Sequence, residues 1–170
     1  MIFLGIGSNM SSSFGDRFDN INLAISALYE HGIQMIKKSS FYEPFSYPNK
    51  ENPKFINIVT SVRTHLQPID LMSVLISIEE RLERKRNKKN DPRTCDIDII
   101  DYNNQVLSFQ YKNLYLEIPH RKLISRNFVL FPLQEISSEW KHPITKENIR
   151  ALIDKLSEED KKSILMVKKN

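Results

Sequence analysis

The chain has 170 residues, of which 40% are hydrophobic and 27% charged, with a formal net charge of +4. This length predicts one domain over residues 1–170, and no run of about 18 apolar residues is present to span a membrane. The N-terminus lacks the basic region of a signal peptide, and Cys95, the single cysteine, cannot form an internal disulfide. We therefore expect a cytoplasmic protein that does not bind membranes.

Three strands and two helices are expected in the first half of the chain. Alternating or β-branched stretches predict strands at residues 2–6, 33–42 and 55–64. Between the first two strands, Asp16 begins a helix whose apolar stripe ends at Gly32. The proline-containing segment 44–53 is expected to be a loop. Pro68 suits the first turn of a second helix, which carries an apolar stripe as far as Leu82.

The second half is expected to complete the sheet. A strand carries the residues around Asp96, and Asn103–Asn104 predicts a hairpin turn into a further strand at residues 105–109. After a loop come an apolar segment at 128–133, a helix near 147–156 and a charged tail. The tail at 158–170 could be ordered against the sheet or frayed, and the apolar residues 164–167 indicate a short edge strand. Because strands outnumber βαβ units, we expect an α+β fold with a mostly antiparallel sheet and helices packed on its outer face.

Two carboxylates, Asp96 and Asp98, lie two residues apart in an apolar, β-branched run. In a strand their side chains point the same way, with Cα atoms roughly 6.5 Å apart. Two buried like charges are costly unless a cation lies between them, and Mg²⁺ prefers such hard oxygen ligands. The alternative is a strand with one solvated face. Aspartate is a poor strand former, which favours a metal site formed by Asp96 and Asp98.

Six cationic residues precede this strand within nine positions: Arg81, Arg84, Lys85, Arg86, Lys88 and Lys89. A basic loop beside two metal-binding carboxylates suits triphosphate chemistry, because cations neutralise the oxygens that gain charge during transfer. A solvated helix end is the alternative for any single residue. For the cluster as a whole, phosphate binding is favoured.

Two other places carry candidate binding residues. His120 follows a proline on an expected loop with Arg121, Lys122 and Arg126, and it could contact a phosphate or simply be a hydrogen-bonded histidine. Phe55 and Asn57 share one strand face, where an aromatic ring and an amide could stack on and hydrogen-bond a flat heterocycle. Core packing would explain Phe55 equally well. The chain has no P-loop and no dinucleotide-binding glycine motif.

Several motifs, in order and spacing, resemble the 6-hydroxymethyl-7,8-dihydropterin pyrophosphokinase family over almost the whole chain. They are GIGSN at 5–9, SSFYE at 39–43, FIN at 55–57, PRTCDIDI at 92–99, IPH at 118–120 and RNFVL at 126–130. The resemblance implies a ferredoxin-like sandwich and a single ATP-dependent pyrophosphokinase domain. Such an enzyme transfers pyrophosphate from ATP to the hydroxymethyl group of the pterin and releases AMP, in folate biosynthesis.

The resemblance also implies roles for individual residues. Asp96 and Asp98 would hold two Mg²⁺ ions. The implied catalytic residues are Arg84, Arg86, Arg93, Asp96 and Asp98. The implied ATP-binding residues are Glu79, Arg86, Arg93, His120 and Arg126. The implied pterin-binding residues are Pro44, Phe45, Phe55, Asn57 and Phe128, with the two aromatic rings of Phe55 and Phe128 enclosing the pterin. Where the family commonly has tryptophan and a small residue before Pro-Arg-Thr, this chain has Asn90 and Asp91.

The alternative is a small α+β module that binds single-stranded RNA through the basic run and Phe55. Against it, the chain is only mildly basic, and the Asp96 and Asp98 carboxylates would repel phosphates in the absence of metal. We therefore expect ATP and the pterin as partners, no nucleic acid, and a monomer.

Overall fold

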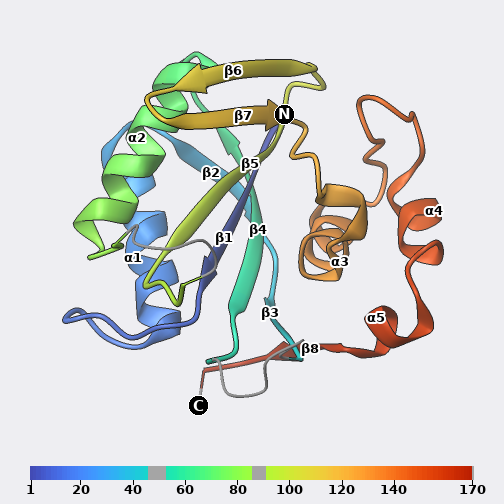
Figure 1. Ribbon diagram of the computed structural model, residues 1–170, viewed down its shortest axis with the longest axis horizontal. Coiled ribbons are helices and arrows are strands. Elements are labelled where there is room, and N and C mark those ends of the chain that lie inside the picture. Colours follow the sequence, from blue (N-terminus) through green and yellow to red (C-terminus); the bar gives the residue numbers. More distant parts are fainter. Residues whose placement is uncertain (46–52, 86–90, 170) are drawn as a thin grey trace.

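A computed structural model of the protein describes residues 1–45, 53–85 and 91–169. It contains a six-stranded sheet in the order β5-β1-β4-β3-β8, with β2 also paired to β4, and every recorded pair is antiparallel (Figure 1). The strands are β1 Ile2–Ser8, β2 Gln34–Lys38, β3 Phe41–Pro44, β4 Ile56–Arg63, β5 Asp96–Tyr102 and β8 Ile164–Val167. Among the described residues, no helix is both long and apolar enough to cross a bilayer.

Helices α1 (Arg17–Glu30) and α2 (Pro68–Arg81) cover one face of this sheet (Figure 1). Asp16 caps α1, because its carboxylate accepts hydrogen bonds from the first-turn amides of Phe18 and Asp19. Proline stands at the first position of α2, where no intrahelical amide is needed. The apolar stripes of both helices pack on alternate residues of β1, such as Leu4, in the larger core.

The opposite face of the sheet is covered in part by α3 (Asn127–Ile136) and α4 (Ile149–Asp154). This second core includes Phe3 of β1, Val59 of β4 and Ile100 of β5. A short helix, α5 (Glu158–Lys162), leads from α4 to β8. The α+β class and the mostly antiparallel sheet are therefore confirmed, and the helices lie on both faces rather than one.

Several expected elements differ from the structure. The strand expected at 33–42 is divided into β2 and β3 at Ser39, and Pro44 belongs to β3 rather than to a loop. The predicted hairpin between β5 and residues 105–109 is wrong. Asn103 and Asn104 do form a turn with positive φ, but β6 (Leu107–Tyr111) then pairs with β7 (Leu114–Ile118) in a separate sheet. The apolar segment at 128–133 is part of α3, whereas the edge strand at 164–167 is confirmed.

Candidate active site

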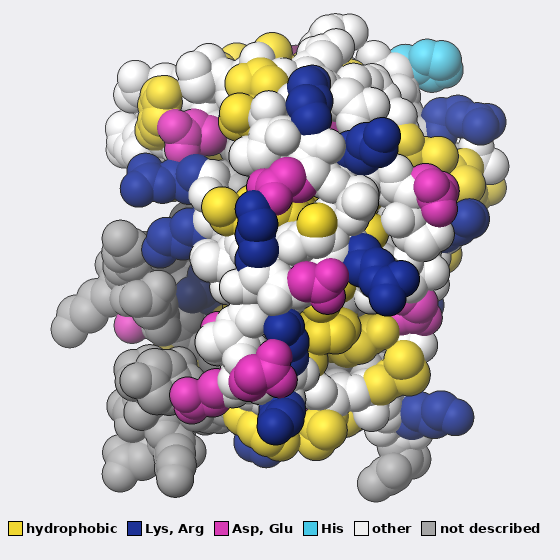
Figure 2. All heavy atoms as spheres, turned by 90° about the vertical axis from the view of Figure 1, so that its right-hand side faces the viewer, with side chains coloured by type: hydrophobic (Ala, Val, Ile, Leu, Met, Phe, Trp, Pro, Cys, Tyr) yellow, Lys and Arg dark blue, Asp and Glu magenta, His cyan; other side chains and the backbone are white. Residues whose placement is uncertain are grey.

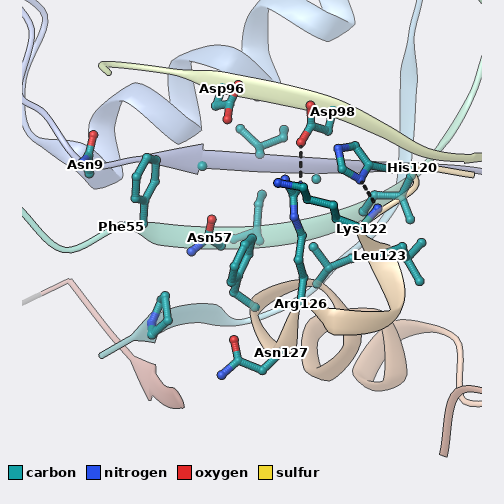
Figure 3. Close-up of a pocket in the computed structure, with 18 of the residues that line it drawn as sticks. Asn9, Phe55, Asn57, Asp96, Asp98, His120, Lys122, Leu123, Arg126 and Asn127 are labelled. Atoms are coloured by element: carbon teal, nitrogen blue, oxygen red, sulfur yellow. Dashed lines mark hydrogen bonds and ion pairs between the residues drawn. The ribbon is translucent and has the colours of Figure 1, made fainter. Parts of the chain in front are cut away.

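A cavity of about 650 Å³ lies on the face of the sheet that α3 covers only in part (Figure 3). Its floor is formed by β1, β4 and β5, and its walls by the segment 120–129 and by residues near β3. Ten of the residues predicted from the sequence line it: Pro44, Phe45, Phe55, Asn57, Arg93, Asp96, Asp98, His120, Arg126 and Phe128. The fold therefore gathers side chains from four separate regions of the chain.

Asp96 and Asp98 lie on the same face of β5, and their carboxylates point into the cavity (Figure 3). Burial at the cavity floor and repulsion from Asp96 raise the pKa of Asp98, although His120 and Arg126 act in the opposite direction. Two carboxylates on one strand face offer the hard oxygen ligands that Mg²⁺ prefers, so the chemistry of this pair fits a divalent metal ion. In the part of the chain that the structure describes, no cluster of three or more potential metal ligands is present.

Each carboxylate of this pair forms an ion pair with at least one arginine. Arg84 Nη1 lies 2.6 Å from Asp96 Oδ1, and Arg93 Nη1 lies 3.2 Å from Asp96 Oδ2. Arg126 Nη1 lies 3.2 Å from Asp98 Oδ2. Three guanidinium groups thus neutralise the negative charge at the place where the sequence predicts metal and triphosphate.

Glu79 of α2 and Arg84, three residues beyond the end of α2, lie near the carboxylate pair and do not line the cavity. The Glu79 side chain is 1% exposed, forms an ion pair with Arg84 and accepts a hydrogen bond from the Ile97 amide at 2.7 Å. Its position beneath β5 orients Arg84 toward Asp96. The contact of Glu79 with ATP stays a prediction, and Arg86 lies outside the described residues.

The other half of the cavity is aromatic. Phe55 and Phe128 line it, and the guanidinium groups of Arg93 and Arg126 lie 5.6 and 5.5 Å from the respective ring centroids. Asn57 is 8% exposed, and its Nδ2 has no hydrogen-bond partner among the described residues. A buried amide without a partner fits a site whose ligand brings an acceptor at its edge.

Gly7 separates the aromatic half of the cavity from the carboxylate pair. It lies opposite Asn57 on one side and Asp96 on the other, because β1 runs between β4 and β5. A Cβ atom at this position would lie 2.7 Å from Asn57 Oδ1 and 3.4 Å from the Phe55 ring. The missing side chain therefore keeps the space between the two halves open.

His120 lies beside Asp98 at the cavity wall (Figure 3). Burial lowers the pKa of His120, although the neighbouring Asp98 opposes this effect. Its Nδ1 accepts a hydrogen bond from the Lys122 amide at 3.1 Å, so the neutral ring carries its proton on Nε2. A neutral imidazole of this kind can donate one hydrogen bond to a phosphate oxygen.

The chain matches known proteins over most of its length. The model of 7,8-dihydro-6-hydroxymethylpterin-pyrophosphokinase (HPPK) matches residues 3–138. The chain belongs to the HPPK family. The 2-amino-4-hydroxy-6-hydroxymethyldihydropteridine pyrophosphokinase of Aquifex aeolicus is 33% identical over 149 residues, which are 88% of this chain and 88% of that protein. The Folic acid synthesis protein fol1 of Schizosaccharomyces pombe is 36% identical over 91% of this chain.

Solved HPPK structures share the fold. The crystal structure of Plasmodium falciparum HPPK-DHPS with pteroate superposes with a TM-score of 0.68, at 17% identity, over 91% of this chain and 42% of that chain. The chain spans 20% of the length of the S. pombe protein. The HPPK fold is thus shown for this chain, whereas some relatives carry the same region within much longer proteins.

Other residues that line the cavity were not among the predicted site residues, and the polar or charged ones are Asn9, Lys54, Lys122, Ser125, Asn127, Asp160 and Ser163. Asn9 accepts a hydrogen bond from the Arg93 amide at 2.7 Å and donates to the Pro53 carbonyl at 3.1 Å, so it joins two loops at the rim. An asparagine directly after a strand end is the signal that could have indicated it. Lys122 lies in the basic stretch around His120. Asp160 and Ser163 lie in the charged tail, where no local pattern points to a site.

Proposed function

We propose that the chain transfers pyrophosphate from ATP to the hydroxymethyl group of 6-hydroxymethyl-7,8-dihydropterin and releases AMP, as a step of folate biosynthesis. Membership of the HPPK family supports this activity. The observation that carries the proposal is one cavity in which an aromatic half, with an amide that has no partner among the described residues, adjoins two carboxylates and the arginines Arg93 and Arg126 that pair with them. A flat heterocycle with a reactive side arm and a magnesium-bound triphosphate have the matching chemistry.

The pterin would occupy the aromatic half. Phe55 and Phe128 would stack on the two faces of its ring, and Asn57 Nδ2 would donate a hydrogen bond to an acceptor on its edge. Pro44 and Phe45 would cover the outer side of the ring. In this orientation the hydroxymethyl group passes over Gly7 toward Asp96, where the absence of a side chain leaves room for it.

Asp96 and Asp98 would hold two Mg²⁺ ions, which when bound would neutralise the charge of the triphosphate oxygens. Arg84, Arg93 and Arg126 now pair with these carboxylates and would turn to phosphate oxygens when ATP is bound. The hydroxymethyl oxygen attacks the β-phosphorus, the bond to the bridging α–β oxygen breaks, and AMP leaves. The arginines and His120 stabilise the charge that develops on the oxygens during this transfer.

The alternative function, binding of single-stranded RNA, fits the described fold less well. Sheets that bind RNA present aromatic side chains on an open face. Here helices cover both faces, and Phe55 lies in a cavity next to two carboxylates. On the side of the molecule shown in Figure 2, Lys and Arg side chains alternate with Asp and Glu. We therefore retain the proposal of an enzyme without a nucleic-acid partner.

The test is the release of AMP from ATP and Mg²⁺, measured with and without 6-hydroxymethyl-7,8-dihydropterin. We expect AMP only when the pterin is present, no ADP, and no turnover after chelation of Mg²⁺. Release of ADP, or equal AMP release without the pterin, would refute pyrophosphate transfer. RNA binding that weakens with salt and is independent of ATP would support the alternative.

A further inference from the structure

The C-terminal segment, defined as residues 157–167, forms part of the cavity wall although the HPPK match ends at residue 138. Asp160 and Ser163 of this segment line the cavity. The segment contains α5 and β8, and β8 lies beside β3 at the edge of the sheet (Figure 1). The wall that it forms is the one that also contains Pro44 and Phe45.

The C-terminal segment holds the end of β3 in place. β8 pairs antiparallel with β3 over four positions, from Phe41 opposite Val167 to Pro44 opposite Ile164. Beyond the last pair, the Phe45 amide donates a hydrogen bond to the Ser163 carbonyl, with an N–O distance of 2.6 Å. Pro44 and Phe45 therefore owe their position to backbone hydrogen bonds with this segment.

Asn127 connects this segment to the opposite wall of the cavity. It begins α3, directly before Phe128, and is 7% exposed. Its Nδ2 donates to the Asp160 carbonyl at 2.7 Å and to Ser163 Oγ at 3.0 Å. One buried carboxamide thus joins the helix that carries Phe128 to the segment that holds Phe45.

We propose that Asn127 is a positioning residue that sets, through the C-terminal segment, the separation between Phe128 and the Pro44–Phe45 wall. This separation determines how tightly a flat heterocycle is enclosed, because both stacking and water exclusion depend on close contact. The proposal rests on the pyrophosphokinase function proposed above. It assigns the segment to recognition of the pterin rather than of ATP, since its contacts lead to Phe45 and to the helix that carries Phe128, whereas Asp96 lies beside Gly7 on the next strand.

The test compares variants of the full chain in steady-state kinetics. Asn127→Asp keeps the size of the side chain but removes the amide donor, and Ser163→Ala removes one of the two acceptors. Lys162→Ala is the matched control, because Lys162 is the exposed neighbour of Ser163 and does not line the cavity. We expect the KM for the pterin to rise about fivefold to tenfold in Asn127→Asp and about twofold in Ser163→Ala, with the KM for ATP changed less than about twofold.

A second measurement does not depend on activity. Hydrogen exchange of the Phe45 amide in the ligand-free chain reports its bond to Ser163. We expect faster exchange in Asn127→Asp than in Lys162→Ala. If the wild type is active and Asn127→Asp leaves the KM for the pterin unchanged, or raises the KM for the pterin and the KM for ATP equally, Asn127 has no positioning role. The proposed function would then still stand. Absence of pterin-dependent AMP release by the wild-type chain would instead refute the proposed function. Unchanged exchange of the Phe45 amide in Asn127→Asp would refute the proposed effect of Asn127 on Phe45.

Discussion

Replacing Gly7 with alanine tests whether Asn57 recognises the pterin. The new Cβ would lie 2.7 Å from Asn57 Oδ1, about 0.7 Å closer than the 3.4 Å at which ordinary contact begins. Asn57 must then move, and with it the buried Nδ2 group, which has no partner among the described residues. Phe55, at 3.4 Å, needs no comparable shift. The substitution should therefore disturb the edge hydrogen bond more than the stacking.

The expected size of the effect follows from this geometry. Overpacking of this kind costs about 1–3 kcal/mol of stability, and loss of one hydrogen bond to a ligand weakens binding about tenfold. We expect the KM for the pterin to rise about tenfold, with the KM for ATP nearly unchanged and the melting temperature lower by several degrees. Steady-state kinetics and thermal unfolding of the same preparation measure these quantities.

Gly5→Ala is the matched control for this experiment. Gly5 lies on the same strand, and its added Cβ would meet the Ile100 Cδ1 atom at 3.1 Å. The end of a flexible apolar side chain can shift by a few tenths of an ångström without touching Asn57. If Gly5→Ala and Gly7→Ala raise the pterin KM equally, or if neither does, the assignment of Asn57 to the pterin edge is wrong.

Three further predictions concern the metal site, Arg84 and pH. Asp98→Ala should lower kcat about 10³-fold while retaining the native circular dichroism spectrum, and the exposed Asp154→Ala serves as its control; normal turnover would exclude Asp98 as a metal ligand. Arg84→Ala should lower kcat by a larger factor than it lowers the affinity for ATP. It should also cost about 3–5 kcal/mol of unfolding free energy, because it breaks the buried ion pair with Glu79. The double variant Arg84→Ala/Glu79→Gln should regain stability but not kcat, and recovery of kcat would refute a catalytic role for Arg84. Burial lowers the pKa of His142 in the folded chain below its ordinary value of 6.5. As the pH drops below about 6.5, the unfolded chain therefore binds more protons at this residue than the folded chain does, and the free energy of unfolding should fall. Urea titrations of wild type and His142→Asn should show a weaker pH dependence in the variant; equal slopes would contradict this.

The elements that the sequence predicted well are those defined by neighbouring residues. Asp16 caps α1 and Pro68 begins α2, and both apolar stripes have the helical period. β4 and β5 alternate as expected. The pairing of β6 with β7 was missed because partner choice depends on long-range packing rather than on the turn at Asn103–Asn104. The helix α3 was not predicted, since its apolar run, which includes Pro132, has no clear polar face.

The sequence by itself determined the pairing of Asp96 and Asp98 on one strand face, because the two-residue period of a β-strand is a local property. Family resemblance supplied the expectation that Phe55, His120, Arg126 and Phe128 would share one site, and the structure brings all four to the cavity. Only the tertiary structure showed that Glu79 pairs with Arg84 beneath the sheet, that Gly7 keeps space beside Asn57, and that Asp160 and Ser163 close the wall. Apart from the Glu79–Arg84 pair, these contacts join residues that are distant in the chain. No local pattern encodes them, because their geometry is set by how the helices and the C-terminal segment pack on the sheet.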